Sequence, residues 1–198
     1  TDKNHNLFLT VGLCAMVSLF VCISYYTLSN WFPTFLNEVF NLNSSHSILV
    51  TSLLYICSYV ATTFAYNLCE RWKKTFSQVA RAYGMLALIP CALLIFLFDF
   101  NVIFAIALGV LTVCFNRGVC SLINTYLPLK LNNHINSATT ALILNGSASA
   151  GAAIGPAISG ALVDFGSWNI FYAFIFIVFA ITLAFVFAAT HFYKKLKV

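Results

Sequence analysis

The amino-acid sequence predicts an all-α polytopic membrane protein with six transmembrane helices. Six long apolar stretches are separated by short polar turns. Hydrophobic residues make up 61% of the 198 residues, charged residues only 8%, and the mean hydropathy is +0.92. Each stretch supplies the roughly 20 helical residues that cross a hydrocarbon layer of about 30 Å. A water-soluble domain of this length would carry far more charged surface.

The predicted spans form a single transmembrane domain, 1–198, and cover residues 7–32, 47–68, 76–98, 102–126, 137–162 and 170–192. The first span should end or bend at Pro33, because proline lacks a backbone N–H and restricts the residue before it. The first, second, fourth and fifth spans carry polar side chains well inside the membrane, where such groups need partners or water. The third and sixth spans are almost devoid of polar groups and can face lipid over most of their circumference. We therefore expect spans one, two, four and five to surround a wet cavity or an interface.

Charged residues alternate between the two sides of the predicted membrane. Three connections on one side carry Glu38, Asp99 and Asp164 and no basic residue. Nine of the ten basic residues fall on the other side: Lys3, Arg71, Lys73, Lys74, Arg81, Lys130, Lys194, Lys195 and Lys197. The positive-inside rule then places both ends of the segment in the cytoplasm, in a cell, inner or endomembrane. The net charge of +5 is explained by these loops and the tail, so it indicates topology and not a nucleic-acid partner.

The residue types needed for catalysis or cofactor binding are not found at membrane depth. All four histidines (His5, His46, His134, His191) lie at or beyond the ends of spans, and no Asp or Glu lies inside one. The seven cysteines are scattered without a Cys-x-x-Cys pair, which disfavours a zinc or redox centre. The sequence therefore predicts neither an enzyme nor a bound cofactor. A channel is also disfavoured, because no filter-like or Asn-Pro-Ala element is present.

Arg117 is the tenth basic residue and lies inside the fourth span. An arginine near the bilayer centre costs about 2.5–3.5 kcal/mol, so it should face a cavity and have a partner. Its partner would be an anionic solute, an acidic group elsewhere, or backbone carbonyls and water; the planar donor fork suits a carboxylate or phosphate. Ser121 and Asn124 share a helical face with Arg117. The predicted substrate-binding set is Arg117, Asn116, Ser121, Asn124, Tyr26, Asn30 and Asn145.

Two further motifs indicate a conformational role. Small residues and a proline recur on one face of the fifth span, at Gly151, Gly155, Pro156 and Gly160. Such a face admits a close helix neighbour, which is either a static crossing or one that moves during a cycle. The loop after the second span carries Glu70, Arg71 and Lys74. These charges either only set the orientation of the protein in the membrane, or they pair with the ends of neighbouring helices and stabilise one conformational state.

With these motifs, the chain resembles the carboxy-terminal half of a major facilitator superfamily transporter. The family motif between the second and third helices reads Gly-x-x-x-Asp-Arg-x-Gly-Arg-Arg. Here Glu70 replaces the Asp, Arg71 matches and Lys74 replaces an Arg, while Tyr66 and Lys73 stand where glycines are expected. The resemblance implies two inverted three-helix repeats, secondary transport by alternating access, and a second six-helix half in the full-length chain or another subunit.

Two stretches are similar to the organophosphate:phosphate antiporters: residues 25–36, and residues 137–160 followed by 166–172. This likeness implies an organic anion or phosphate ester as the solute, although such carriers commonly have a basic residue on the first helix and this first span has none. A proton-coupled metabolite or drug porter of the same superfamily is the alternative. A non-transporting membrane receptor or assembly subunit is the alternative from another class. The expected partners are the lipid bilayer, the small solute and the second six-helix half.

Overall fold

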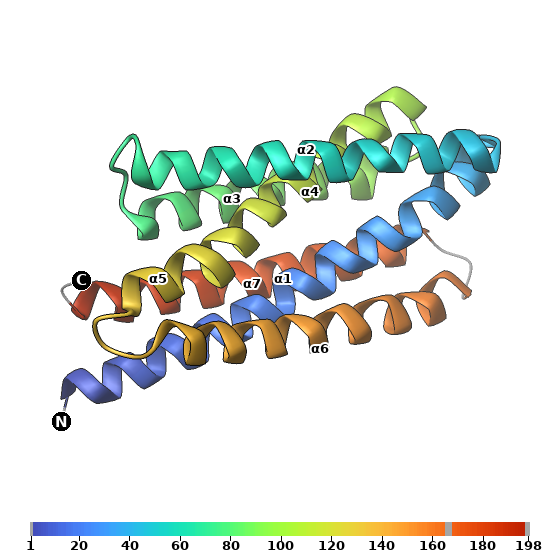
Figure 1. The fold of residues 1–198 in the computed structure, drawn as a ribbon. Coiled ribbons are helices and arrows are strands. Elements are labelled where there is room, and N and C mark those ends of the chain that lie inside the picture. The colour runs from blue at the N-terminus through green and yellow to red at the C-terminus, as the bar shows by residue number, and fades with distance from the viewer. Residues whose placement is uncertain (1, 165–167, 197–198) are drawn as a thin grey trace.

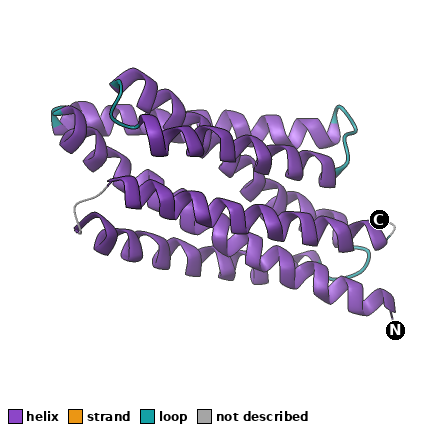
Figure 2. Ribbon diagram, turned by 180° about the vertical axis from the view of Figure 1, so that it is seen from behind, coloured by secondary structure: helices purple, strands orange, loops and turns teal. Residues whose placement is uncertain are grey.

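The computed structural model describes residues 2–164 and 168–196, and this part of the chain is entirely helical apart from short loops (Figure 2). Six of its helical segments are long and apolar enough to cross a membrane, which confirms the predicted class. Successive segments run back and forth, so that both chain ends lie at the same end of the bundle (Figure 1). The elements are α1 (Asp2–Phe40), α2 (Ser44–Glu70), α3 (Phe76–Leu97), α4 (Val102–Ser121), the π-helical η1 (Leu122–Tyr126), α5 (Leu127–Leu131), α6 (Ser137–Asp164) and α7 (Trp168–Lys195).

The helices form two packed groups. One group contains α1, α6 and α7, with α1 packed closely on both of the others. The second contains α2, α3 and α4, with α4 packed closely on both of the others. Contacts of α3 with α7 and of α1 with α4 and α2 join the groups. On the opposite side α2 and α6 stand apart, with α1 crossing between them (Figure 1).

Side-chain caps mark where several helices begin. The side-chain oxygens of Asn43, Asn101 and Asn136 accept hydrogen bonds from backbone N–H groups two residues later, at 3.1, 2.8 and 2.8 Å. Before α3, Gln78 accepts a hydrogen bond from the backbone N–H of Thr75 at 3.4 Å, as in a capping box. These caps satisfy N–H groups that have no partner inside the helix.

The first helix is longer than the sequence predicts. It continues through Pro33 to Phe40, so of the two outcomes predicted at Pro33, an end or a bend, the end is wrong. Phe32, Phe35 and Leu36, which flank the proline, are at most 1% exposed. Their burial holds this turn in place, because neighbouring helices compensate for a proline inside a transmembrane helix. The helix ends at Phe40 and is followed by Asn41, whose positive φ of 52° is a conformation that asparagine tolerates.

Burial along the spans differs from the expected pattern. In the most apolar part of each span, 44% of the α3 residues and 39% of the α7 residues are buried, against 22% for α2 and 17% for α6. The apolar helices α3 and α7 pack against each other and against α4 and α1, so they are more buried than the polar helices α2 and α6. The polar helices α2 and α6 are less buried and leave one side of the molecule open.

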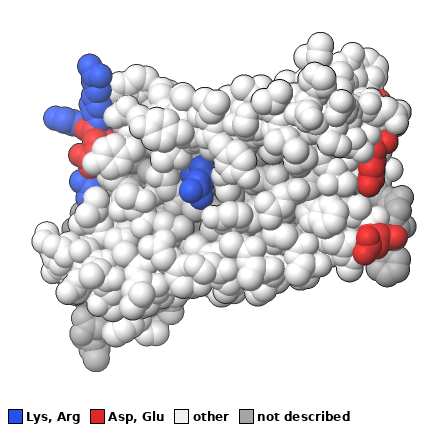
Figure 3. Space-filling model, turned by 45° about the vertical axis from the view of Figure 1, so that its right-hand side comes forward, with Lys and Arg blue, Asp and Glu red and all other residues white. Residues whose placement is uncertain are grey.

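Charge is segregated along the helix axes (Figure 3). Basic and acidic atoms lie together at one end of the molecule, acidic atoms lie at the other, and basic atoms lie at mid-length. The described residues thus keep the alternation on which the predicted sidedness is based. Positions 165–167 and Lys197 lie outside the described residues.

Candidate binding pocket

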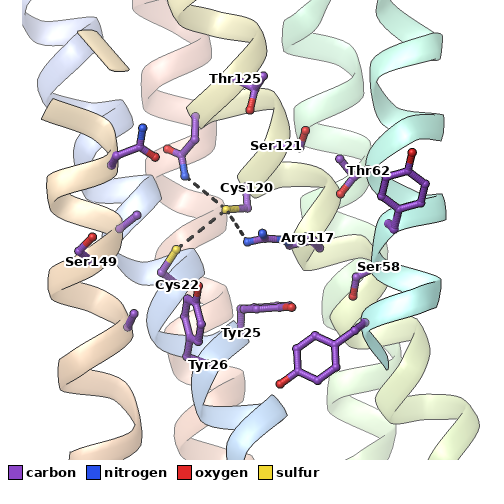
Figure 4. Close-up of a pocket in the computed structure, with 16 residues that line it drawn as sticks. Cys22, Tyr25, Tyr26, Ser58, Thr62, Arg117, Cys120, Ser121, Thr125 and Ser149 are labelled. Atoms are coloured by element: carbon purple, nitrogen blue, oxygen red, sulfur yellow. Dashed lines mark hydrogen bonds between the residues drawn. The ribbon is translucent and has the colours of Figure 1, made fainter. Parts of the chain in front are cut away.

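A polar pocket of about 520 Å³ lies between α2 and α6, on the open side of the molecule (Figure 4). Its walls come from α1, α2, α4, η1 and α6, which are the four spans with polar residues. Hydroxyl, amide and thiol groups dominate the lining, which consists of Cys22, Tyr25, Tyr26, Tyr55, Ser58, Tyr59, Thr62, Arg117, Cys120, Ser121, Asn124, Thr125, Asn145, Ala148, Ser149 and Ala152. A pocket of this size and polarity suits a small, hydrogen-bonding solute.

Arg117 supplies the only formal charge among these lining residues. Its guanidinium carbon lies 4.7 Å from the centre of the Tyr25 ring, and its Nη1 donates to Cys120 Sγ at 3.5 Å. A cation–π contact contributes about 0.5–2 kcal/mol, depending on desolvation. This is less than the roughly 2.5–3.5 kcal/mol that arginine costs at such a depth. Within residues 2–164 and 168–196 no carboxylate pairs with Arg117, so the pocket keeps a net positive charge.

A hydrogen-bond network holds the pocket floor together. Asn124 donates to Cys120 Sγ at 3.3 Å, and the sulfurs of Cys120 and Cys22 lie 3.9 Å apart. On the far side, the Ser18 hydroxyl lies 2.6 Å from Asn124 Oδ1 and 2.9 Å from the Leu144 carbonyl oxygen. The network therefore links α1, α4, η1 and α6, and it orients the Asn124 side chain.

The π-helical turn η1 places Asn124 and Thr125 in the pocket wall. The backbone N–H of Leu127 bonds to the Leu122 carbonyl, five residues back, which is the π-helical pattern. Pro128 explains the wider turn, because it has no N–H for the Asn124 carbonyl and its ring would clash with that group in an α-helix. Sequence reasoning ended the fourth span at residue 126 and missed this turn, whereas the span runs on to Leu131.

The structure brings together five of the seven residues predicted to bind substrate. Tyr26, Arg117, Ser121, Asn124 and Asn145 line the pocket. Asn116 and Asn30 do not.

The two residues outside the pocket have different surroundings. Asn116 is 2% exposed, and its Nδ2 donates to the Val21 carbonyl at 3.2 Å and to Ser24 Oγ at 3.0 Å. It therefore joins α4 to α1. It does not line the pocket, because it lies about 100° around the helix from Arg117. Asn30 is exposed near the other end of α1.

Several pocket residues were not in the predicted set, and the sequence carries a signal for one group of them. Tyr55, Ser58, Tyr59 and Thr62 all line the pocket from α2. Their spacing of three, four and seven residues is that of one helical face. The sequence therefore showed this polar face of the second span. Cys22 and Cys120 gave no such sign, because isolated cysteines in spans ordinarily behave as small apolar residues.

The glycine face of α6 packs directly on α1. A β-carbon added to Gly155 would lie 2.6 Å from the Ile23 carbonyl oxygen, and one added to Gly151 would collide with the Leu19 carbonyl. Beside them, the Trp31 indole donates to the Pro156 carbonyl at 3.3 Å, and its ring lies against Gly160. The small residues thus allow close backbone approach, as their spacing predicts.

At the basic end, Glu70 Oε1 lies 3.0 Å from Lys130 Nζ, joining the end of α2 to the end of α5. Arg71 and Lys74 are exposed in the loop after α2. Both partners of the ion pair are 42% exposed, and exposed pairs contribute about 0–1 kcal/mol. The Glu70–Lys130 ion pair therefore contributes little stability, and a conformational change can break it at small energetic cost.

Together the six spans and this pocket define a polytopic α-helical membrane protein that contacts the lipid bilayer. Within the part of the chain that the structure describes, no group of three or more His, Cys, Asp or Glu side chains could hold a metal ion. A comparison of the sequence with models of known protein families finds no match, and a comparison with curated proteins finds none either.

Proposed function

We propose that this protein is a secondary transporter that moves a small organic anion or phosphate ester by alternating access. One observation carries the proposal: a positively charged arginine without a carboxylate partner among the described residues lies in a polar pocket, midway along the apolar span Val102–Leu131. Arginine binds carboxylate and phosphate groups through two parallel hydrogen bonds, and a low dielectric strengthens such contacts. An anion in the pocket would offset the cost of holding Arg117 there.

The architecture we propose is that of one half of a major facilitator superfamily transporter. The resemblance of the loop with Glu70 and Arg71, and of the Gly151–Gly160 face, supports this assignment. In it, α1–α3 and α4–α7 are the two inverted repeats, and both ends of the segment are cytoplasmic. The solute site lies near the membrane midplane, where such transporters bind their substrates.

A second six-helix half would cover the open side. Asn145 and Ser149 are exposed on α6, and Tyr55 and Tyr59 are exposed on α2. Polar groups exposed to hydrocarbon are costly, so a partner surface or water must meet them. A second half facing α2 and α6 would enclose the pocket and give the two bundles that alternating access requires.

The proposed movements use two contacts described above. The α1–α6 crossing at Gly151, Gly155, Pro156 and Gly160 allows the helices to rock, because small side chains do not interlock. The loop with Glu70, Arg71 and Lys74 sets which state is held at the basic end, through the Glu70–Lys130 pair in the state seen here.

The test is uptake of labelled inorganic phosphate and glucose 6-phosphate by proteoliposomes that contain the protein together with its second half. We expect Arg117→Lys to fold and to transport with weaker affinity, and Arg117→Ala to abolish transport. Arg81→Lys is the matched control, because Arg81 lies away from the pocket and donates to Thr190 Oγ1 at 2.7 Å. Unchanged affinity in Arg117→Ala would refute the anion site. Binding without uptake would favour a receptor over a transporter.

A further inference from the structure

A second cavity, of about 790 Å³, lies on the other side of α2 from the polar pocket and shares no lining residue with it. It is a groove between α2 and α3 with α4 behind it. Although α2 and α3 follow each other in the chain, they hardly touch, because both pack on α4. The groove is therefore a consequence of helix packing in this three-helix group.

The groove is apolar along its length and basic at one end. Val60, Ala61 and Phe64 of α2 form one wall, and Ala82 and Leu86 of α3 form the other. Its floor includes Tyr83 and Phe115, whose rings meet edge to face with centroids 5.7 Å apart. Lys74 of the basic loop and Gln78 of the first turn of α3 line the end of the groove next to this loop.

The groove extends through about half of the membrane. On α2 it runs from Leu68 to Cys57, a rise of about 16 Å at 1.5 Å per residue. One leaflet contributes about 15 Å of the roughly 30 Å hydrocarbon layer. A transmembrane helix of a partner would need a groove of about twice this length. A single acyl chain that enters from the basic end has the right length.

The exposed basic residues at the open end of the groove favour a lipid with an anionic headgroup. Lys74 is exposed, and its backbone N–H donates to the Leu68 carbonyl at 3.0 Å, which fixes the loop over the groove. Arg71 and Lys73 are exposed in the same loop, and the nearby Glu70 is paired with Lys130. Basic residues beside a membrane helix attract anionic lipid headgroups, and the amino end of α3 adds a partial positive charge.

We propose that this groove is a binding site for one anionic glycerophospholipid, with its phosphate at Lys74 and Gln78 and one acyl chain between α2 and α3. The site is independent of the polar pocket and does not depend on the proposed transport activity. A bound lipid would fill the space between two helices that otherwise hardly touch. It would therefore stabilise the α2–α3–α4 group.

The test is native mass spectrometry of the purified protein with equal amounts of phosphatidylglycerol and phosphatidylcholine that carry the same acyl chains. We expect phosphatidylglycerol to be retained at least fivefold more, and Lys74→Gln to lower its retention about fivefold. Lys195→Gln is the charge control, since Lys195 lies at the end of α7. Equal retention of the two lipids, or equal loss in both lysine variants, would overturn the headgroup site.

Filling the groove tests the acyl-chain position. Ala61→Phe and Ala82→Phe, on opposite walls, should each reduce retention of both lipids, while Ala180→Phe on an exposed part of α7 should not. Circular dichroism and gel filtration establish that each variant is folded, and having two groove variants keeps the test valid if one fails to fold. Retention that is unchanged in a folded groove variant, or a protein dimer that persists in place of lipid, would overturn the proposal.

Discussion

The crossing of α1 and α6 provides a stability test in which a single methyl group is added. In Gly155→Ala the new β-carbon would lie 2.6 Å from the Ile23 carbonyl oxygen, 2.8 Å from Thr27 Oγ1 and 2.9 Å from the Ile23 α-carbon. Ordinary van der Waals contact begins at 3.4 Å, so the two helices must separate by about 0.8 Å. Two of the three obstructing atoms belong to the α1 backbone and cannot turn away.

The expected loss of stability follows from two contributions. Forcing an extra methyl group into a closely packed contact costs about 1–3 kcal/mol. Displacing Thr27 also weakens the hydrogen bond that it accepts from Ser159 at 3.0 Å, which adds about 1 kcal/mol. Alanine also favours helix by up to about 1 kcal/mol over glycine, which offsets part of this loss. We therefore expect the free energy of unfolding to fall by about 1–3 kcal/mol in Gly155→Ala.

Gly146→Ala is the matched control on the same helix. Nothing lies within 4 Å of a β-carbon at Gly146, and alanine favours helix by up to about 1 kcal/mol over glycine. Its unfolding free energy should therefore be unchanged or slightly higher. The assay is reversible unfolding in mixed detergent and dodecyl sulfate micelles, followed by far-UV circular dichroism. Equal midpoints for the two variants would refute the close α1–α6 contact.

Three other outcomes are expected. If the α1–α6 contact moves during transport, Gly155→Leu should reduce transport more than it reduces the amount of folded protein; equal losses would indicate static packing. Cysteines placed at positions 43 and 73 of a variant without other cysteines should react with a membrane-impermeant reagent from opposite sides, and labelling of both from one side would contradict the six-span topology. Asn116→Leu removes two hydrogen bonds to α1 and should lower the unfolding free energy by about 1–3 kcal/mol. Asn145→Leu, at an exposed position, should change it by less than about 0.5 kcal/mol; similar effects of these two substitutions would contradict the different placement of the asparagines.

The spans could be predicted from the sequence because a membrane-crossing helix depends mainly on local length and hydropathy. The shared face of Arg117, Ser121 and Asn124 could also be predicted, since helical spacing alone defines it. The position of Asn116 could not, because the helix it points toward depends on how α4 packs on α1. Pro33 is a similar case: its local effect favours a break, but the buried side chains around it maintain the helix. In both places tertiary packing decides the outcome.

The π-helical turn has a consequence for the distant end of the fourth span. It inserts one extra residue into the turn, so everything after it is rotated by about 100° relative to a continuous α-helix. Beyond this turn, Lys130 Nζ lies 3.0 Å from Glu70 Oε1 and 5.1 Å from the centre of the Tyr126 ring. Pro128, by favouring the π-helical turn, therefore sets the angle around the helix axis between two features: Asn124 in the pocket wall, and Lys130 in the ion pair at the basic end.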